Sequence, residues 1–205
     1  MKFITKSVLI ALFAITLVPF SACKKGANDP SISLRSRTGR LTGVWKLSAF
    51  DQTKKTVTGT TFVTTTTVVT SYDGTFKTEV TTVKAGNGNP NTSTDKVTYS
   101  ATFTVNKDHT FKMEIVEDGQ TDVIEGTWAW IEGNGAELKK KEAIQIFITK
   151  ETFSGGSAMT VTGFNNGATL VLSRLANDEI QIDLTESTTS SNYSETVTGT
   201  QTFKQ

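Results

Sequence analysis

The stretch TFKMEIVEDGQTDVIEGTWAW (residues 110–130) decides the fold, because it holds two runs of alternating apolar and polar residues around one turn. Phe111 and Met113 share one parity in the first run, and Trp128 and Trp130 share one parity in the second. A period of two is the pattern of a β-strand with one buried face. The Asp-Gly pair between the runs is typical of a hairpin turn. We therefore predict two antiparallel strands here.

The same alternation continues through most of the chain after residue 41. The composition agrees with strands, since 38 of the 205 residues are Thr and only 3 are Pro. The only helix candidate is the short, Lys-rich segment 136–143. Hairpin-linked strands with one apolar face must bury that face together. We expect an all-β fold, an antiparallel up-and-down barrel of roughly 8–10 strands, with a two-sheet β-sandwich as the alternative. The other alternating runs lie at 45–49, 101–105, 144–148, 170–172 and 180–184.

Two segments interrupt the clean pattern. Residues 56–83 are rich in Thr, which suits strands but gives little contrast between an inner and an outer face. We expect a long hairpin there that extends beyond the barrel rim or forms an edge. Residues 85–96 are rich in Gly, Asn, Ser and Thr and contain Pro90, so we expect a rim loop.

The N-terminus has the features of a secretory signal. Lys2 and Lys6 precede an apolar run at residues 8–20, which is too short to span a bilayer. The sequence Phe20-Ser21-Ala22-Cys23 resembles the lipobox of bacterial lipoproteins, in which the Cys becomes the first mature residue and carries the lipid. We expect a signal peptide at 1–22, lipid attachment at Cys23, and a flexible tether over 23–40.

The residues after Cys23 carry the sorting information in that family. Lys24 follows the Cys directly, where Asp would be the usual inner-membrane retention signal, and the acidic cluster used for surface display is absent. The resemblance therefore implies the outer membrane and favours its periplasmic face. Three acyl chains, as in similar lipoproteins, would anchor the chain stably to the membrane.

Three short motifs in residues 41–205 resemble lipocalin-like domain lipoproteins of the Bacteroidetes type. Gly43-Val44-Trp45 resembles the Gly-x-Trp signature, and Gly126-Thr127-Trp128 is a second such unit. It is preceded by Asp108-His109-Thr110-Phe111, where His109 stands at the Gly of the D-G-T-F pattern of these proteins. The third motif is the run 170–175 followed by 180–182, which resembles their closing strands. The resemblance implies a lipocalin-like β-barrel domain over 41–205, with Trp45 closing one end. It also implies a cation packed over that ring, for which Arg174 and Lys204 are the candidates.

Composition and motifs argue against several other functions. The formal net charge is +1, without the basic surplus of a nucleic-acid binder. The chain has one Cys and one His, so Cys- or His-based metal sites and most His-dependent catalysis are not expected. Carboxylates such as Glu114 and Glu125 alternate outward on strands, which favours solvated faces. We predict no enzyme activity, no cofactor and no metal.

Two functions remain open. The first is a binding protein that holds a small apolar or amphipathic ligand inside the barrel. The second is an envelope structural or interaction protein with a filled core, which binds a protein or glycan through the Thr-rich hairpin and the rim loops. The candidate cavity-lining residues are those of inward parity: Trp45, Phe103, Phe111, Met113, Trp128, Trp130, Ile146 and Ile182.

Overall fold

The computed structural model describes residues 35–131, 142–154 and 167–205, and the backbone alone of 158–160. The predictions for the signal peptide, for Cys23 and for most of segment 136–143 therefore lie outside the described residues. The described elements are one helix, α2 (Arg37–Leu41), and the strands β1 (Gly43–Thr58), β2 (Thr64–Tyr72), β3 (Phe76–Ala85), β4 (Asn91–Val105), β5 (Thr110–Glu117), β6 (Gln120–Trp130), β7 (Glu142–Thr152), β8 (Ala158–Thr160), β9 (Gly167–Leu175), β10 (Glu179–Ser190) and β11 (Tyr193–Lys204).

The strands form a closed antiparallel ring. Ten of them follow one another in the order β6-β5-β4-β3-β2-β1-β11-β10-β9-β7, and pairing of β6 with β7 closes the ring, while β8 lies on β7. Neighbours in the ring are mostly neighbours in the sequence, because short turns join antiparallel strands. The predicted up-and-down barrel is confirmed, and the alternative of a two-sheet sandwich is wrong.

The ring is narrower at one end than at the other. The first residues of β1 pair directly with the last residues of β4, from Gly43 with Val105 to Lys46 with Thr102. Strands β2 and β3 enter only beyond this point, where Phe50 pairs with Tyr72. At this end the ring of ten therefore lacks β2 and β3, so eight strands enclose the core.

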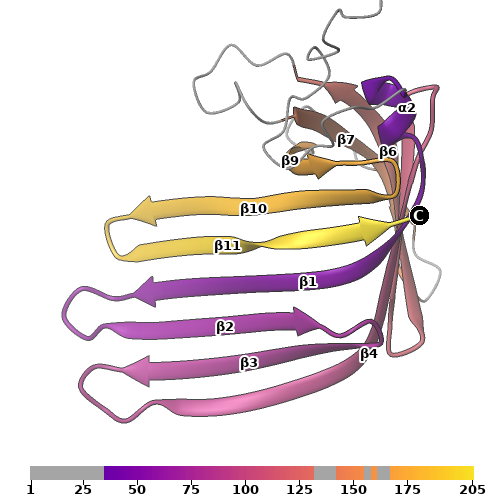
Figure 1. Cartoon of the computed structure of the whole chain (residues 1–205). Helices are drawn as coiled ribbons and strands as arrows, with labels where there is room; N and C mark the ends of the chain where they lie inside the picture. The colour runs from indigo at the N-terminus through magenta and orange to yellow at the C-terminus, as the bar shows by residue number, and fades with distance from the viewer. Residues whose placement is uncertain (1–34, 132–141, 155–157, 161–166) are drawn as a thin grey trace, which may run out of the picture.

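Beyond the barrel, six strands continue as one extended sheet in the order β10, β11, β1, β2, β3 and β4 (Figure 1). The expectation of one long hairpin at 56–83 is corrected: this segment completes β1 and adds β2 and most of β3 as two further strands. The loop expected over 85–96 is also shorter, because β4 begins at Asn91. Register across the sheet is continuous, since the backbone ladder aligns residues that the Thr-rich pattern leaves ambiguous.

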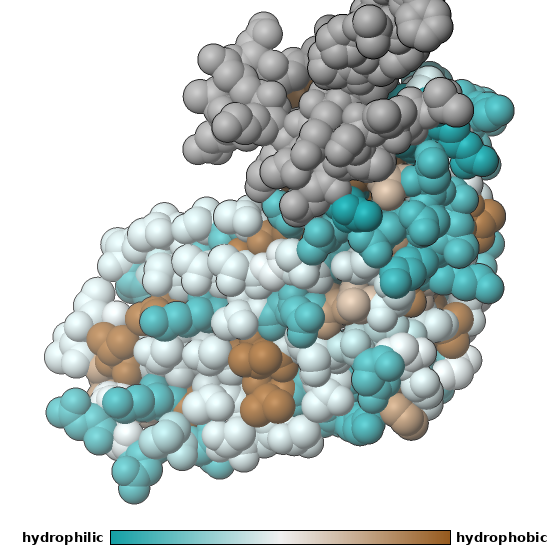
Figure 2. Space-filling model, in the orientation of Figure 1, coloured by the Kyte–Doolittle hydropathy of each residue, from teal (hydrophilic) through white to brown (hydrophobic). Residues whose placement is uncertain are grey.

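The abundance of Thr has a simple physical reason in this extension. One cross-strand row consists only of β-branched residues, which suit a pleated surface whether or not it is covered. In Figure 2, the side of the sheet that faces the viewer is mostly pale, the colour of residues of near-neutral hydropathy. That row runs through Thr185, Thr198, Thr53, Val69, Val80 and Thr94.

The domain begins earlier than residue 41. Ser36 caps α2 by accepting a hydrogen bond from the Gly39 N–H at 3.0 Å, and Arg40 and Leu41 are buried. Arg40 Nη1 donates to the Leu175 carbonyl at 2.6 Å, and its Nη2 lies 3.7 Å from Glu142 Oε1. Residues 37–41, most of which were expected to belong to a flexible tether over 23–40, are instead helical, and burial of Arg40 and Leu41 attaches them to the barrel.

Aspartates stabilise two hairpin turns and should make the free energy of unfolding depend on pH in the acidic range. The carboxylate of Asp73 accepts the Phe76 and Thr75 N–H groups, and these hydrogen bonds lower its pKa from the ordinary 3.8. The hydroxyl and N–H of Thr110 lower the pKa of Asp108 in the same way. Because each folded-state pKa is below the unfolded value, the stabilisation is complete above the unfolded pKa and is lost as the pH falls through the folded one.

We expect the free energy of unfolding to fall between about pH 6 and about pH 3. The double variant Asp73→Asn/Asp108→Asn should be less stable at the upper pH and should lose less on acidification. Urea unfolding at both pH values measures this difference. An acid-induced loss equal to that of the parent chain would show that these two turns do not contribute.

Candidate functional site

Burial of the inward-facing side chains decreases along the barrel from one end to the other. On β10, Ile180 and Ile182 are buried and Leu184 is only partly buried. On β7, Ile144 is buried, whereas Ile146 and Ile148 are partly buried. Strands β4 and β5 show the same trend. The barrel is therefore packed solid at the end where α2 lies, and its inner apolar wall stays accessible to solvent at the other, which we call the open end.

The eight residues predicted to line a cavity differ in burial, and one of the partly buried ones, Trp130, lies at the packed end, where its indole N–H is 3.2 Å from the Thr38 hydroxyl of α2. Five belong to the packed core, where edge-to-face and tilted aromatic pairs such as Phe103 with Phe111 and Phe103 with Phe203 fill the space. Three are partly buried against that core. The buried five are Trp45, Phe103, Phe111, Trp128 and Ile182, and the partly buried three are Met113, Trp130 and Ile146.

The open end combines two tyrosines with this apolar wall. The rings of Tyr72 and Tyr99 meet edge to face, with centroids 5.9 Å apart and planes at 75°. Burial raises the pKa of both phenols, so both keep their hydroxyl proton near neutral pH. Sequence reasoning missed these residues, although both have the inward parity of their strands. Five further partly buried apolar residues pack against the same core: Ile115, Ile124, Ile148, Leu170 and Leu184.

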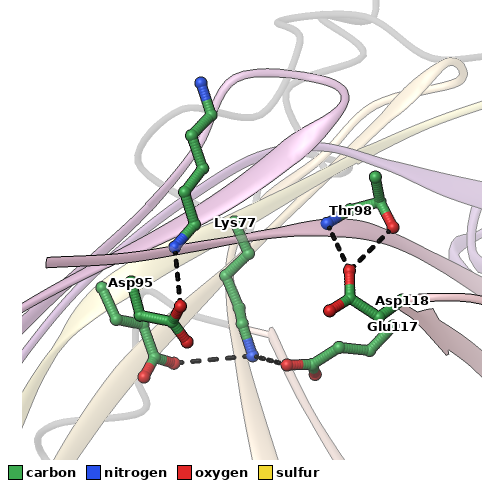
Figure 3. A network of polar contacts seen from close by, with 7 residues as sticks. Lys77, Asp95, Thr98, Glu117 and Asp118 are labelled. Carbon is green, nitrogen blue, oxygen red and sulfur yellow. Dashed lines mark hydrogen bonds and ion pairs between the residues drawn. The ribbon is translucent and has the colours of Figure 1, made fainter.

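A charged group from β3 completes the open end (Figure 3). Lys77 Nζ lies 2.7 Å from Glu117 Oε1 and 3.5 Å from Glu79 Oε1, and 5.1 Å from the centroid of the Tyr99 ring. Partial burial opposes the charge of Lys77, but the hydrogen bond and the charge of Glu117 outweigh it and raise the pKa of this lysine. An ammonium, two carboxylates and two phenols therefore lie beside an apolar wall.

The turn after β5 is fastened to β4 next to this group. Asp118 Oδ1 accepts hydrogen bonds from both the N–H and the hydroxyl of Thr98 at 3.1 Å (Figure 3). Asp118 has a φ of +47°, in the left-handed region that Asp tolerates better than most residues. These contacts connect the β5–β6 turn to the sheet extension and thereby place Glu117 against Lys77.

The two cations predicted to cover Trp45 meet one carboxylate. Arg174 Nε lies 2.7 Å from Glu179 Oε1, and Lys204 Nζ lies 3.8 Å from Glu179 Oε2. Trp45 is fully buried, and its indole N–H donates to the Leu41 carbonyl at 2.8 Å. That one of the two cations covers Trp45 stays a prediction. A cation–indole contact does occur nearby, between the Arg37 guanidinium and the Trp130 ring at 4.1 Å.

His109 has a structural position at the packed end. Its ring stacks on Trp128 at a centroid distance of 4.7 Å, and its Nδ1 lies 3.2 Å from the Trp128 carbonyl. Its φ of +67° is in the left-handed region that favours glycine, which explains a Gly at this place in the D-G-T-F pattern. Stacking on Trp128 offsets part of the backbone strain of a non-glycine residue here.

The described residues contain neither a ready metal site nor a membrane-spanning helix. Within them, no group of three or more His, Cys, Asp or Glu side chains is placed to hold a metal ion. The helical part of the described chain contains no segment that is both long and apolar enough to cross a bilayer.

Comparison with known proteins gives no relative from which a function could be transferred. No protein-family model matches the chain, and neither a curated protein nor a solved structure shows significant similarity to it.

Proposed function

We propose that this chain is a lipocalin-like binding protein of the bacterial cell envelope, anchored through a lipid on Cys23 and acting without catalysis. Its location is the outer membrane, on the periplasmic face, as the sorting residues after Cys23 imply. It holds a small apolar or amphipathic molecule at the open end of the barrel, and it takes no nucleic acid and no cofactor.

The observation that supports the ligand is the gradient of burial along the barrel. A protein core normally excludes water throughout, whereas here seven inward-facing apolar or aromatic side chains near the open end are only partly buried. Sites for small molecules combine such a wall with a few convergent polar groups. Lys77, Glu79 and Glu117 provide these groups, so we expect an apolar body against the wall and a polar head beside Lys77. The seven are Tyr72, Tyr99, Ile115, Ile124, Ile148, Leu170 and Leu184.

Native mass spectrometry of the mature chain, purified from its own envelope in mild detergent, tests this function. We expect a co-purifying mass of lipid or small-molecule size. Leu184→Arg places a charge on the open-end wall and should abolish that mass. Val44→Arg is the matched control, because Val44 is exposed on the outer side of the barrel and its replacement should leave the ligand bound.

Near-UV circular dichroism of both variants shows whether the barrel still folds. A clean ligand-free mass of the parent chain, together with no fluorescence from the apolar dye ANS, would contradict the proposal. The barrel would then have a filled interior.

That outcome would favour the second candidate, an interaction protein of the envelope. The sheet extension supports it, because the outer part of β4 from Asn91 to Lys96 is exposed and has a neighbouring strand on one side only. Such an edge offers unpaired backbone groups to another chain. Crosslinking in intact cells from a photoreactive residue at Thr92 would capture a protein partner of this edge.

A further inference from the structure

The end of the sheet extension farthest from the barrel carries an exposed apolar cluster, and three loops join there into one surface. The Gly59 N–H donates to the Asn192 carbonyl at 2.9 Å, which connects the β1–β2 and β10–β11 loops. The Gly86 N–H donates to the Val63 carbonyl at 2.7 Å and connects the β3–β4 loop. We call this end, comprising residues 59–63, 86–90 and 191–192, the distal tip (Figure 1).

The distal tip concentrates exposed hydrophobic side chains. Of the seven large hydrophobic residues that are exposed in the described structure, Phe62, Val63 and Val83 lie at or beside it, with 68%, 39% and 37% of their surface accessible. Single exposed apolar residues are normal, but a cluster at the end of a projection indicates a contact surface.

The loop that presents Phe62 is held in one conformation. Gly59 has a φ of +93°, and a Cβ on it would lie 2.2 Å from the Phe62 carbonyl oxygen. Gly86 has a φ of +53°, and a Cβ there would lie 3.0 Å from the Phe62 ring. Both positions therefore require glycine, and the ring rests against Gly86 while most of it faces solvent. A side chain ordered in advance loses little entropy on binding.

Size and charge indicate the kind of partner. One phenylalanine and two valines are too small a patch for a stable protein interface, which buries about 800 Å² on each side. Within the last four residue pairs of each strand ladder at this end, the charged residues are Lys55, Lys84 and Glu195. Glu195 forms an ion pair with Lys54 at 3.0 Å and accepts a hydrogen bond from the Tyr193 hydroxyl at 2.6 Å. A small apolar tip with exposed lysines matches a bilayer surface that carries anionic headgroups.

The proposed lipid anchor makes such a small contact sufficient. Residues 24–34 separate Cys23 from the described domain and span at most about 40 Å when extended. Strand β1, which runs from the barrel end to the distal tip, has 16 residues and is about 50 Å long. Because the anchor keeps the bilayer within about 40 Å of the start of the domain, the distal tip meets the lipid surface at a high effective concentration.

We propose that the distal tip docks on the lipid surface to which the chain is anchored, with Phe62 and Val63 inserted among the headgroups and Lys55 and Lys84 beside them. This inference rests on the proposed lipidation of Cys23. The domain would then lie along the membrane, attached at both ends, instead of standing away from it on a tether.

Site-specific fluorescence on the anchored protein tests the proposal. The chain has a single Cys, which the lipid occupies, so Thr60→Cys supplies a unique thiol at the tip for the fluorophore NBD. The lipidated chain is reconstituted in vesicles of phosphatidylethanolamine and phosphatidylglycerol. We expect a blue-shifted emission that lipids with brominated acyl chains quench. The same label at Thr121→Cys, on the β6 strand of the barrel, should stay unquenched.

Two variants distinguish a specific contact at the tip from nonspecific binding through any exposed apolar side chain. Phe62→Ser should lower the fraction of inserted label about tenfold, since it removes the largest apolar side chain of the contact. Phe153→Ser removes another exposed phenylalanine, which directly follows β7 of the barrel and is far from the tip in sequence. This change should leave the signal unchanged. Both residues are exposed, so neither change should prevent folding.

The outcomes are distinguishable. A mass spectrum of the purified chain first shows whether Cys23 carries lipid; a free Cys23 overturns the anchoring and the tip contact that depends on it. A lipidated chain whose Thr60 label stays aqueous overturns the tip contact and leaves the anchoring intact. A label that is aqueous on vesicles but becomes buried when outer-membrane proteins are added also overturns it, and identifies a protein as the partner.

Discussion

Replacing Gly126 by Ala should destabilise the barrel by about 3 kcal/mol or more, a large share of the stability of an ordinary domain. A Cβ at this position would lie 2.0 Å from the Phe147 carbonyl oxygen and 2.8 Å from Phe111 Cε1. The first of these is backbone, so no side-chain rotation relieves the overlap. Strand β7 would have to move away from β6, and the pairing of these two strands is what closes the ring.

Urea unfolding followed by tryptophan fluorescence measures this loss, because Trp128 lies two residues away on the same strand. The matched control is Ala129→Val, which adds bulk to an exposed position of β6 and should shift the midpoint very little. If Gly126→Ala unfolded at the same urea concentration as the parent, the close approach of β7 to Gly126 would be refuted.

Replacing Arg40 by Met should lower the free energy of unfolding by about 3–5 kcal/mol. Arg40 and Glu142 are both 3% exposed, and Arg40 Nη2 lies 3.7 Å from Glu142 Oε1. Replacing Arg40 removes this attraction to a buried carboxylate and also deletes the 2.6 Å hydrogen bond to the Leu175 carbonyl.

A double-mutant cycle identifies the source of the loss. Arg40→Met/Glu142→Gln removes both charges and should recover part of the stability lost in Arg40→Met. The control Arg37→Met changes the neighbouring arginine, whose contact with the Trp130 ring is worth only about 0.5–1 kcal/mol. Strictly additive effects of the two single changes would show that Arg40 and Glu142 do not interact.

The candidate site illustrates how far sequence alone reaches. Inward parity correctly selected Trp45, Phe103 and Trp128 as residues of the barrel interior, because alternation follows directly from strand geometry. Parity does not show how far along the barrel each residue lies. The predicted lining therefore consists mostly of the packed core, while Tyr72, Tyr99 and Lys77 at the open end were missed.

The sequence by itself determined the fold class and the turns of this protein, because both depend on local rules. Alternating residues require strands with one buried face, and aspartates with glycines mark where those strands reverse. The Thr-rich segment carries no such contrast between its two faces, so its role was decided only in the tertiary structure. There the backbone ladders of β1 and β4 separate and admit β2 and β3 between them.

The packed end of the barrel, where α2 lies, was likewise decided by contacts between residues far apart in the sequence. Arg40 is one of several basic residues in a polar N-terminal segment, and nothing local distinguishes it from its neighbours. Its burial comes from Glu142 and Leu175, more than 100 residues away, which the closure of the ring brings to the same end. An ion pair or a side-chain-to-backbone hydrogen bond between distant residues leaves no periodic pattern in the sequence. For that reason only the assembled barrel reveals these contacts of Arg40.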